Sequence, residues 1–499
     1  MPPEAMASPN AGGFLVLALA LPVAGILLVF LAGGRYGRGI TLALLVAGVG
    51  IASVIAGGVW RTGDTVTYLA GGWAPPLGIK LRADGLSAAM ILVTSVVTLA
   101  AGLYAPHEFR VPPGKPETRA SLSFWVLLLS VWAAMNAVFL GNDLFNLYVA
   151  LELLTFAGVP LVCLSGTPLT LTAALRYLLF ALLGSALYLL GAVLLYGSYG
   201  TLDIGLLAAQ IRPEPALWLA IALMTAGLAA KTALFPVHIW LPPAHSGAPP
   251  AASALLSALV VKGSFFLIVR LWFDVAPRMT GAIAGQILGA MGAGAIVFGG
   301  VVALRQARLK LLIAYSTVAQ IGYLFLMFPL AAEPNALAGG MFQAISHAFA
   351  KAAMFMAAGL MAGVLGHDRI ADLSGIGRAL PITVFAFGLA ALSLVGVPPS
   401  GGFFTKCLLL SASFTAGQWW WAAVILIGGL LAGGYMFRAL MPALTDPEIP
   451  LTLPAPVSRV REIVVLALAV CAFLVGMFPQ KPIELLQIGR VHLPEVAPP

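Results

Sequence analysis

Long apolar segments recur along the whole chain, and no other feature of the sequence limits the possible folds as strongly. About fourteen of them are separated by short polar or proline-rich breaks, and each has the roughly 20 residues that an α-helix needs to cross a bilayer. Only 9% of the 499 residues are charged, whereas soluble domains carry about 25%. The sequence therefore predicts an all-α integral membrane protein with about 14 transmembrane helices, and it excludes a soluble enzyme.

The expected spans have apolar cores at 13–33, 39–60, 84–105, 121–140, 144–164, 171–197, 215–235, 250–272, 281–303, 311–330, 336–364, 381–409, 417–440 and 459–479. The first span lacks a basic leader and a clear cleavage site, so we expect it to remain as a helix. Between the second and third spans, residues 61–82 carry β-forming residues around a Gly/Pro turn. This pattern predicts a short extramembrane hairpin.

The loop charges predict the orientation of the chain. With an even number of spans both termini lie on one side, and alternate loops carry thirteen Lys/Arg on one side against eight, including Arg270, on the other. Cytoplasmic loops carry the excess of positive charge, so we expect both termini outside. The net charge of +8 comes without a basic and aromatic cluster, which excludes nucleic acid as a partner. The Cys and His spacings fit neither a disulfide framework nor a metal site.

Six charged residues lie inside or at the end of apolar spans: Glu152, Arg176, Lys231, Lys262, Lys351 and Lys406. Each costs at least about 2.5 kcal/mol to insert, so such residues face partners or water. Burial raises the pKa of a carboxyl group and lowers that of an amine, and both shifts favour proton exchange near neutral pH. A proton relay is therefore one interpretation. A snorkelling or structurally paired side chain is the other, above all for Arg176 and Lys351.

Two helices are interrupted next to a buried lysine. Pro236, Pro242 and Pro243 follow Lys231, and a Gly/Pro run at 396–402 precedes Lys406. Unwound backbone at membrane depth is tolerated where it lines a cavity, and broken helices in two halves of a chain indicate an inverted-repeat transporter. A proline kink that serves packing alone is the alternative.

Histidines accompany these lysines. His238 and His245 follow Lys231 by seven and fourteen residues, and His347 precedes Lys351 by one helical turn. An imidazole near its ordinary pKa of about 6.5 accepts and releases protons repeatedly. The arrangement favours a proton wire, although any single His could serve a structural hydrogen bond.

Several long strings carry a family resemblance. LFNLYVALELLTFAGVPLV, KTALFPVHIWLPPAHSGAPPAASALLSALVVKGSFFLIVRL, LLIAYSTVAQIGYLFL, ISHAFAKAAMF and LSLVGVPPSGGFFTKCLLL resemble the antiporter-like proton-translocating subunits shared by complex I, membrane-bound hydrogenases and Mrp-type cation/proton antiporters. RYLLFALLGSALYLLGAVLLYGSYGTLDI and the region from PPSGGFFTKCLLL to AGQWWW most resemble the D subunit of Mrp antiporters. The resemblance covers about residues 84–440 and implies two inverted five-helix repeats, each with a broken helix.

The resemblance also implies a division of the chain and of its site. We expect three N-terminal helices with the hairpin (1–110), the first repeat (111–275), the second repeat (276–442) and a C-terminal helix with a tail (443–499). Glu152 and Lys231 would form the coupling ion pair of the first half. Lys262 would be the central relay.

The remaining roles follow from the same resemblance. His238 and His245 would lie beside the central lysine, and His347 and Lys351 would pass protons onward to Lys406 in an outer half-channel. Arg176 stands where many relatives have Lys. Because Arg does not readily deprotonate, we expect a structural or electrostatic role there.

The sequence thus indicates a proton-translocating subunit of a multi-subunit complex in a bacterial cell membrane, of which an Mrp-type antiporter is favoured. The partners would be other membrane subunits, lipid, protons and, in an antiporter, a cation such as Na⁺. A pumping subunit of a complex I-like or hydrogenase-type oxidoreductase is the main alternative, followed by a stand-alone solute symporter and an inert anchor. No redox-cofactor motif is present, so we expect no cofactor and no redox chemistry in this chain. The short stretch after the last span suggests an inner subunit of the complex.

Overall fold

The computed structural model describes residues 9–109, 118–276, 282–445 and 457–490 as a bundle of long helices. In the described ranges, twelve helical segments are long and apolar enough to cross a membrane. These segments correspond to the following helices: α1 (Pro9–Ala32), α2 (Gly34–Thr62), α3 (Gly85–Tyr104), α4 (Arg119–Leu140), α5 (Leu144–Val162), α6 (Pro168–Tyr199), α8 (Pro215–Thr232), the segment Pro250–Val275, α12 (Ala282–Leu304), α14 (Pro334–Leu365), α18 (Trp419–Leu444) and α19 (Arg459–Met477). Two shorter apolar helices, α13 (Leu309–Phe325) and α16 (Pro381–Val395), lie where the two remaining spans are expected. The described helices confirm the all-α membrane fold.

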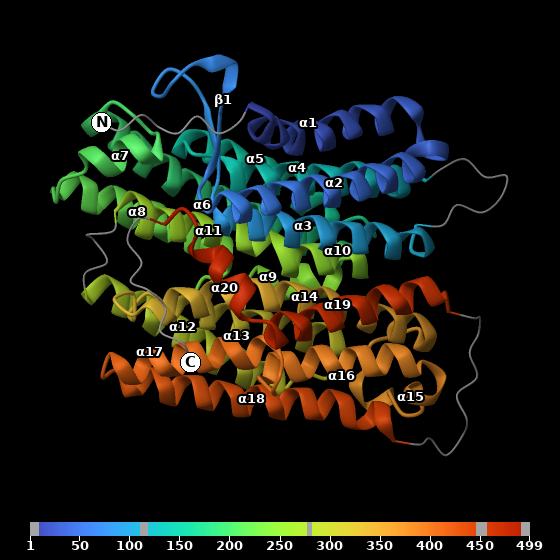
Figure 1. Cartoon of the computed structure of the whole chain (residues 1–499). Coiled ribbons are helices and arrows are strands. Elements are labelled where there is room, and N and C mark those ends of the chain that lie inside the picture. Colours follow the sequence, from blue (N-terminus) through green and yellow to red (C-terminus); the bar gives the residue numbers. More distant parts are fainter. Residues whose placement is uncertain (1–8, 110–117, 277–281, 446–456, 491–499) are drawn as a thin grey trace.

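The segment Pro250–Val275 combines α-helical and π-helical turns. It consists of α10 (Pro250–Leu255), η3 (Leu256–Val260), α11 (Val261–Val269) and η4 (Arg270–Val275). The other short helices are α7 (Ile204–Gln210), α9 (Leu241–Gly247), α15 (Ile376–Ala379), α17 (Gly401–Thr415), α20 (Gln480–Gln487) and the 3₁₀ turns η1 (Ala70–Gly72), η2 (Ala105–His107) and η6 (Ile370–Asp372). In Figure 1 the long helices run side by side, with the N-terminal part of the chain in one half of the bundle and the C-terminal part in the other.

The predicted hairpin is confirmed. β1 (Val66–Leu69) pairs antiparallel with β2 (Lys80–Ala83), with Val66 opposite Ala83 and Leu69 opposite Lys80. The hairpin projects from the bundle beside α1 (Figure 1). We call the end of the bundle where α2 ends and α3 begins the hairpin end.

Arg270 does not lie in a loop, as the charge count assumed. It is buried in η4 and forms ion pairs with Asp84 at 2.5 Å and with Asp274 at 2.6 Å. Asp84 also caps α3 by accepting a hydrogen bond from the backbone N–H of Ser87. A buried guanidinium is stable only when it is paired in this way, and the pairing ties the end of η4 to the hairpin end of α3.

Two parts of the bundle repeat one another. α6 and α14 are both 32 residues long, begin at a proline and are followed by a glycine in the left-handed conformation. The segment before α5 pairs with the segment after α6 through Asp143 and Asp203, and the segment before α13 pairs with the segment after α14 through Arg308 and Arg369. These matching features mark the two five-helix repeats.

Glycines allow the closest helix contacts of each repeat. A Cβ atom on Gly184 of α6 would lie 2.6 Å from the carbonyl oxygen of Gly227 of α8, and one on Gly292 of α12 would lie 2.7 Å from that of Gly322 of α13. Backbones this close exclude any side chain, which is how membrane helices gain packing contacts without a hydrophobic driving force.

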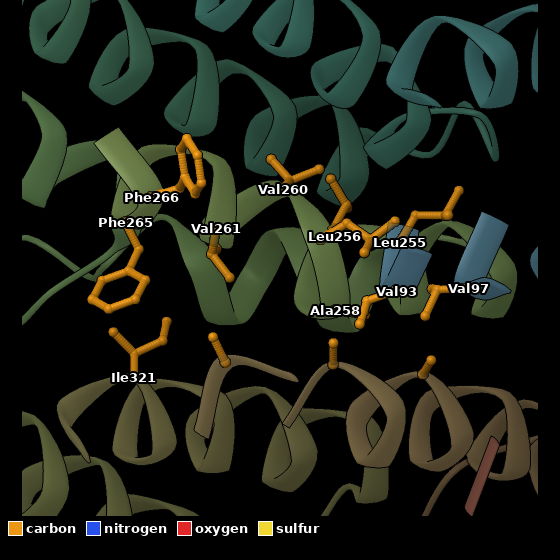
Figure 2. Packing of buried hydrophobic residues seen from close by; sticks show 14 of the residues in the cluster. Val93, Val97, Leu255, Leu256, Ala258, Val260, Val261, Phe265, Phe266 and Ile321 are labelled. Carbon is orange, nitrogen blue, oxygen red and sulfur yellow. The ribbon is translucent and has the colours of Figure 1, made fainter. Parts of the chain in front are cut away.

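The segment Pro250–Val275 is the centre of the bundle, and its most apolar window is fully buried. Figure 2 shows its apolar side chains, among them Leu255 and Phe265, with Val93 of α3 and Ile321 of α13 on neighbouring helices. A lysine on this segment is therefore remote from both lipid and bulk water.

Candidate functional site

The first helix break lies where α8 ends. Ala233 follows α8 in the left-handed conformation (φ 60°), which is uncommon for a residue with a side chain, and Pro236 prevents the helix from continuing. The chain resumes a helix only at α9. Trp240 donates a hydrogen bond from Nε1 to the carbonyl of Ala230 at 2.9 Å and so satisfies one of the freed carbonyls.

Lys231 and Glu152 form the predicted ion pair at this break. Lys231 Nζ lies 3.1 Å from Glu152 Oε1 and 2.9 Å from Thr155 Oγ1. Ser185 of α6 also donates a hydrogen bond to Glu152 Oε1. The lysine side chain is 7% exposed and the glutamate 16%, so the carboxylate reaches towards the lateral surface of the bundle while the amine lies inside.

Lys262 lies at the start of α11, directly after the π-helical turn η3, and is completely buried. Its Nζ is 2.5 Å from the carbonyl oxygen of Ser257 and 2.6 Å from Nδ1 of His347. An ammonium only donates, so beside a charged Lys262 the ring of His347 carries its proton on Nε2. That atom has no hydrogen-bond partner among the described residues. π-Helical turns of this kind often occur at functional sites.

Lys351 and His245 belong to the same buried cluster. Lys351 donates hydrogen bonds to the carbonyl of Ile313 at 3.0 Å and to Ser316 Oγ. His245 and His347 each interact electrostatically with both Lys262 and Lys351. Within the described ranges, neither ring nitrogen of His245 has a hydrogen-bond partner. The central cluster, as we call Lys262, His347, Lys351 and His245, therefore combines two amines with two imidazoles.

His238 and Arg176 lie apart from this cluster. His238 packs against the rings of Phe235 and Phe298 at centroid distances of 5.5 and 5.1 Å, and among the described residues it makes no hydrogen bond with Lys262. Arg176 is exposed on α6, at the outer surface of the bundle. An outward position fits the electrostatic role expected for a residue that keeps its proton.

The second break lies between α16 and α17. α16 ends at Val395, Gly396 adopts φ 91°, and Ser400 caps α17 by accepting from the N–H of Phe403. Lys406 of α17 reaches back to this break and donates to the carbonyl of Leu394 at 2.9 Å and to that of Val395. A cation is favoured at the C-terminal end of a helix, where carbonyls lack intrahelical partners.

Neutral polar residues, which the pattern of charged residues does not indicate, bind the side chains and carbonyls of these sites. They are Thr155, Ser185, Ser316, Gln320 and Gln343. Gln320 donates to the carbonyl of Leu394 at 3.2 Å, and Gln343 donates to Gln320 Oε1 at 2.8 Å. Two glutamines within apolar spans were the available signal, because an amide in hydrocarbon needs partners.

A further acid lies at the end of the bundle opposite the hairpin. Glu108, just beyond α3, accepts from the N–H of Ala251 at 3.3 Å and lies 3.5 Å from the guanidinium of Arg461. Burial raises the pKa of Glu108 to about 7, against the opposing effect of Arg461. Lys310 donates to the carbonyl of Ala248 at 2.5 Å, so charged groups hold both ends of the turn between α9 and α10.

Comparisons with known proteins agree with this architecture. Residues 141–432 match the family described as NADH:quinone oxidoreductase/Mrp antiporter, TM. The chain is 35% identical over 410 residues to NADH-quinone oxidoreductase subunit N of Desulforudis audaxviator, covering 81% of this chain and 80% of that protein. It is 30% identical over 413 residues to the D subunit of the Na⁺/H⁺ antiporter of Bacillus subtilis, covering 81% of each.

A solved structure extends the likeness to nearly the whole chain. A chain of the Mrp complex from Dietzia superimposes with a TM-score of 0.87 and 26% sequence identity, over 97% of this chain and 98% of that one. The match to the family model and the extent of the two sequence alignments confirm the predicted resemblance. The chain belongs to the NADH:quinone oxidoreductase/Mrp antiporter transmembrane family.

Proposed function

We propose that this chain is the proton-translocating subunit of a multi-subunit membrane complex of the Mrp cation/proton antiporter type. The likeness to a chain of the Mrp complex and to the D subunit of an Na⁺/H⁺ antiporter supports this assignment. The observation that carries it is the Glu152–Lys231 pair, 3.1 Å apart at a helix break inside the bundle. A pair of this kind has two states, joined and separated, that differ in their affinity for a proton.

The proposed mechanism starts when Glu152 moves away from Lys231. The amine then loses the anion that stabilises its charge and releases its proton towards the bundle interior. The central cluster receives the proton, and Lys406 passes it to the hairpin end. The imidazoles of His245 and His347 suit this transfer because one ring nitrogen can accept a proton while the other releases one.

Orientation and partners complete the proposal. The excess of Lys and Arg in the loops opposite the hairpin supports a cytoplasmic position for that end, with both termini outside, in a bacterial cell membrane. Residues 111–275 and 276–442 would be the two repeats, flanked by 1–110 and 443–499. Other membrane subunits would be the partners, and a cation such as Na⁺ would be exchanged.

A pumping subunit of a complex I-like oxidoreductase is the second candidate, favoured by the 35% identity to NADH-quinone oxidoreductase subunit N. Purification of the intact complex separates the two. Co-purifying flavin or iron–sulfur subunits would support the oxidoreductase, whereas membrane subunits alone would support the antiporter.

The ion pair itself is tested by Glu152→Gln in everted membrane vesicles that contain the whole complex. We expect normal assembly, because shape is kept, and loss of cation-driven proton transport measured with a pH-sensitive dye. Glu484→Gln, an exposed carboxylate on α20, is the control and should transport normally. Wild-type transport by the Glu152 variant would contradict the proposed mechanism.

A further inference from the structure

Lys351 and Lys406 do not share a hydrogen-bond partner in the described structure. Lys351 Nζ binds the carbonyl of Ile313 and Ser316 Oγ, and Lys406 Nζ binds the carbonyls of Leu394 and Val395. A proton that passes from one amine to the other therefore needs a group between these two sets of partners.

Helix α13 spans most of this separation. Ser316 and Gln320 are four residues apart and lie on the same face of the helix. Ser316 is a partner of Lys351, and Gln320 donates at 3.2 Å to the carbonyl of Leu394, the oxygen that Lys406 binds at 2.9 Å. One face of α13 thus reaches from the first amine to the oxygen that holds the second.

Tyr435 of α18 stands beside the middle of this face. Its side chain is 1% exposed, and its hydroxyl interacts with both Gln320 and Ser316. The geometry of these contacts completes no hydrogen bond, and no other described residue supplies one. A buried tyrosine hydroxyl usually has a partner, and Gln320 and Ser316 are the neighbours to which this hydroxyl could donate a hydrogen bond.

Gln320 does not exchange protons itself, because a neutral amide is a poor carrier. Gln343 donates to Gln320 Oε1 at 2.8 Å, and Gln320 Nε2 donates to the carbonyl of Leu394, so both ends of the amide are fixed. The oxygen retains a second lone pair for a hydroxyl donor. Gln320 is therefore a positioning residue for Tyr435.

We propose that the hydroxyl of Tyr435 carries protons between Lys351 and Lys406. Ser316 takes a proton from Lys351 Nζ as it passes its own hydroxyl proton to the phenol oxygen. The original phenol proton leaves towards the neutral amine of Lys406, directly or through one water molecule. One O–H bond forms as the other breaks, and the phenol remains neutral. This inference rests on the proposed function, because it assigns one step of the same pathway.

Tyr435→Phe tests the step, and Tyr323→Phe is a matched control. Both rings are buried at 1% exposure, and Tyr323 lies against Lys406, with Nζ 5.2 Å from its ring centroid. The hydroxyl of Tyr323, however, donates to the carbonyl of Ile425 at 3.3 Å and points into backbone. We expect the maximal transport rate to fall at least about tenfold for Tyr435→Phe and less than about twofold for Tyr323→Phe. The expected loss for Tyr435→Phe is smaller than the roughly 100-fold or more typical of a lost acid–base group, because water can replace part of the path.

Two readouts separate a relay from a packing role. The melting temperature and subunit content of the assembled complex should match wild type for both variants. The solvent deuterium isotope effect on transport should increase in Tyr435→Phe alone, because proton transfer becomes slower than the other steps. If Tyr435→Phe does not assemble, Ser316→Ala removes the preceding hydroxyl of the path and should lower the rate in the same direction.

The outcomes are distinct from those of the ion-pair test. Wild-type transport by Tyr435→Phe, or by Ser316→Ala where that variant replaces it, while Glu152→Gln is inactive, would overturn the relay and leave the proposed function standing. An equal loss in both tyrosine variants would also overturn it, since packing alone would then explain the effect. Active Glu152→Gln would remove the proposed function on which the relay depends.

Discussion

The two helix breaks bring an ammonium group to similar places by different means. At the first break Lys231 stands on the helix that ends there, and its partner is the carboxylate of Glu152. At the second break Lys406 stands on the helix that begins after it, and its partners are the carbonyls of Leu394 and Val395. One cation is held by a formal charge on a separate helix, and the other by the dipole of the helix it faces.

The two repeats also differ at matching positions of α6 and α14. The eighteenth residue of α6 is Ser185, which binds Glu152, and the eighteenth residue of α14 is Lys351. The first repeat thus has an acid with a hydroxyl partner, where the second has an additional amine. Movement of a side chain can switch the first site, whereas backbone carbonyls at the second cannot move away without unwinding a helix. We therefore assign coupling to the first break and transfer to the second.

The largest effect should come from Lys231. Lys231→Ala should lower transport by at least about 100-fold, and Lys231→Arg should not restore it, because Arg keeps the charge without releasing the proton. Dye-based proton uptake in vesicles measures both variants. Full activity of the Arg variant would show that charge alone matters there, and the contrast between the breaks would fail.

Lys406 should respond differently to substitution. Lys406→Ala should be inactive, but Lys406→Glu should keep part of the activity with a changed pH profile, since a buried carboxyl group can titrate near neutral pH. Transport measured against pH, with subunit content checked by gel, distinguishes the two. Wild-type activity of the Ala variant would remove this residue from the pathway.

A smaller difference should separate two histidines near the first break. His245 belongs to the central cluster, whereas His238 packs against Phe235 and Phe298. We therefore expect His245→Ala to reduce transport several-fold, with water replacing part of the relay, and His238→Ala to have less effect. Rates of the two variants in the same vesicle preparation give the comparison. The reverse order would place the relay at His238, beside Phe298 of α12.

The smallest effect concerns stability at the end opposite the hairpin. The pKa of Glu108 is raised to about 7, so its burial favours the folded state below pH 4.5, and this contribution is lost as the pH rises through 7. Melting temperatures of the purified complex between pH 5 and 8 should therefore fall less with pH in Glu108→Gln than in wild type. Glu484→Gln is exposed and should follow wild type. Identical pH profiles of Glu108→Gln and wild type would contradict the assignment.

The sequence predicted the charged residues of the site, but not the contacts that join them or the uncharged residues between them. Glu152 was recognisable because an acid deep in an apolar span needs a cation, and its pairing with Lys231 followed from the family resemblance. The contact of Lys262 with His347 joins residues 85 positions apart and depends on a π-helical turn that no periodicity indicates. Tyr435 was not recognisable, because a tyrosine in an apolar span usually serves packing.

The loop count failed at Arg270 for a related reason. Near a helix end, sequence alone does not say whether a charge faces water or a buried partner. Here Asp84, 186 residues away, supplies that partner. The expected spans and the hairpin, by contrast, depend on local apolar length and β-propensity, and these were predictable.

The glycine contact between α6 and α8 restricts movement of one half of the ion pair. Gly184 and Gly227 place the two backbones in direct contact, and a Cβ atom on Gly184 would lie 3.0 Å from Cγ of Lys231. α8 has no room to move towards α6, so the amine of Lys231 is held in place on that side. Glu152 lies on α5 and is partly exposed, so we expect the carboxylate to be the member of the pair that moves. A neighbouring protein that shifts α5 would therefore act on the proton pathway without touching any lysine.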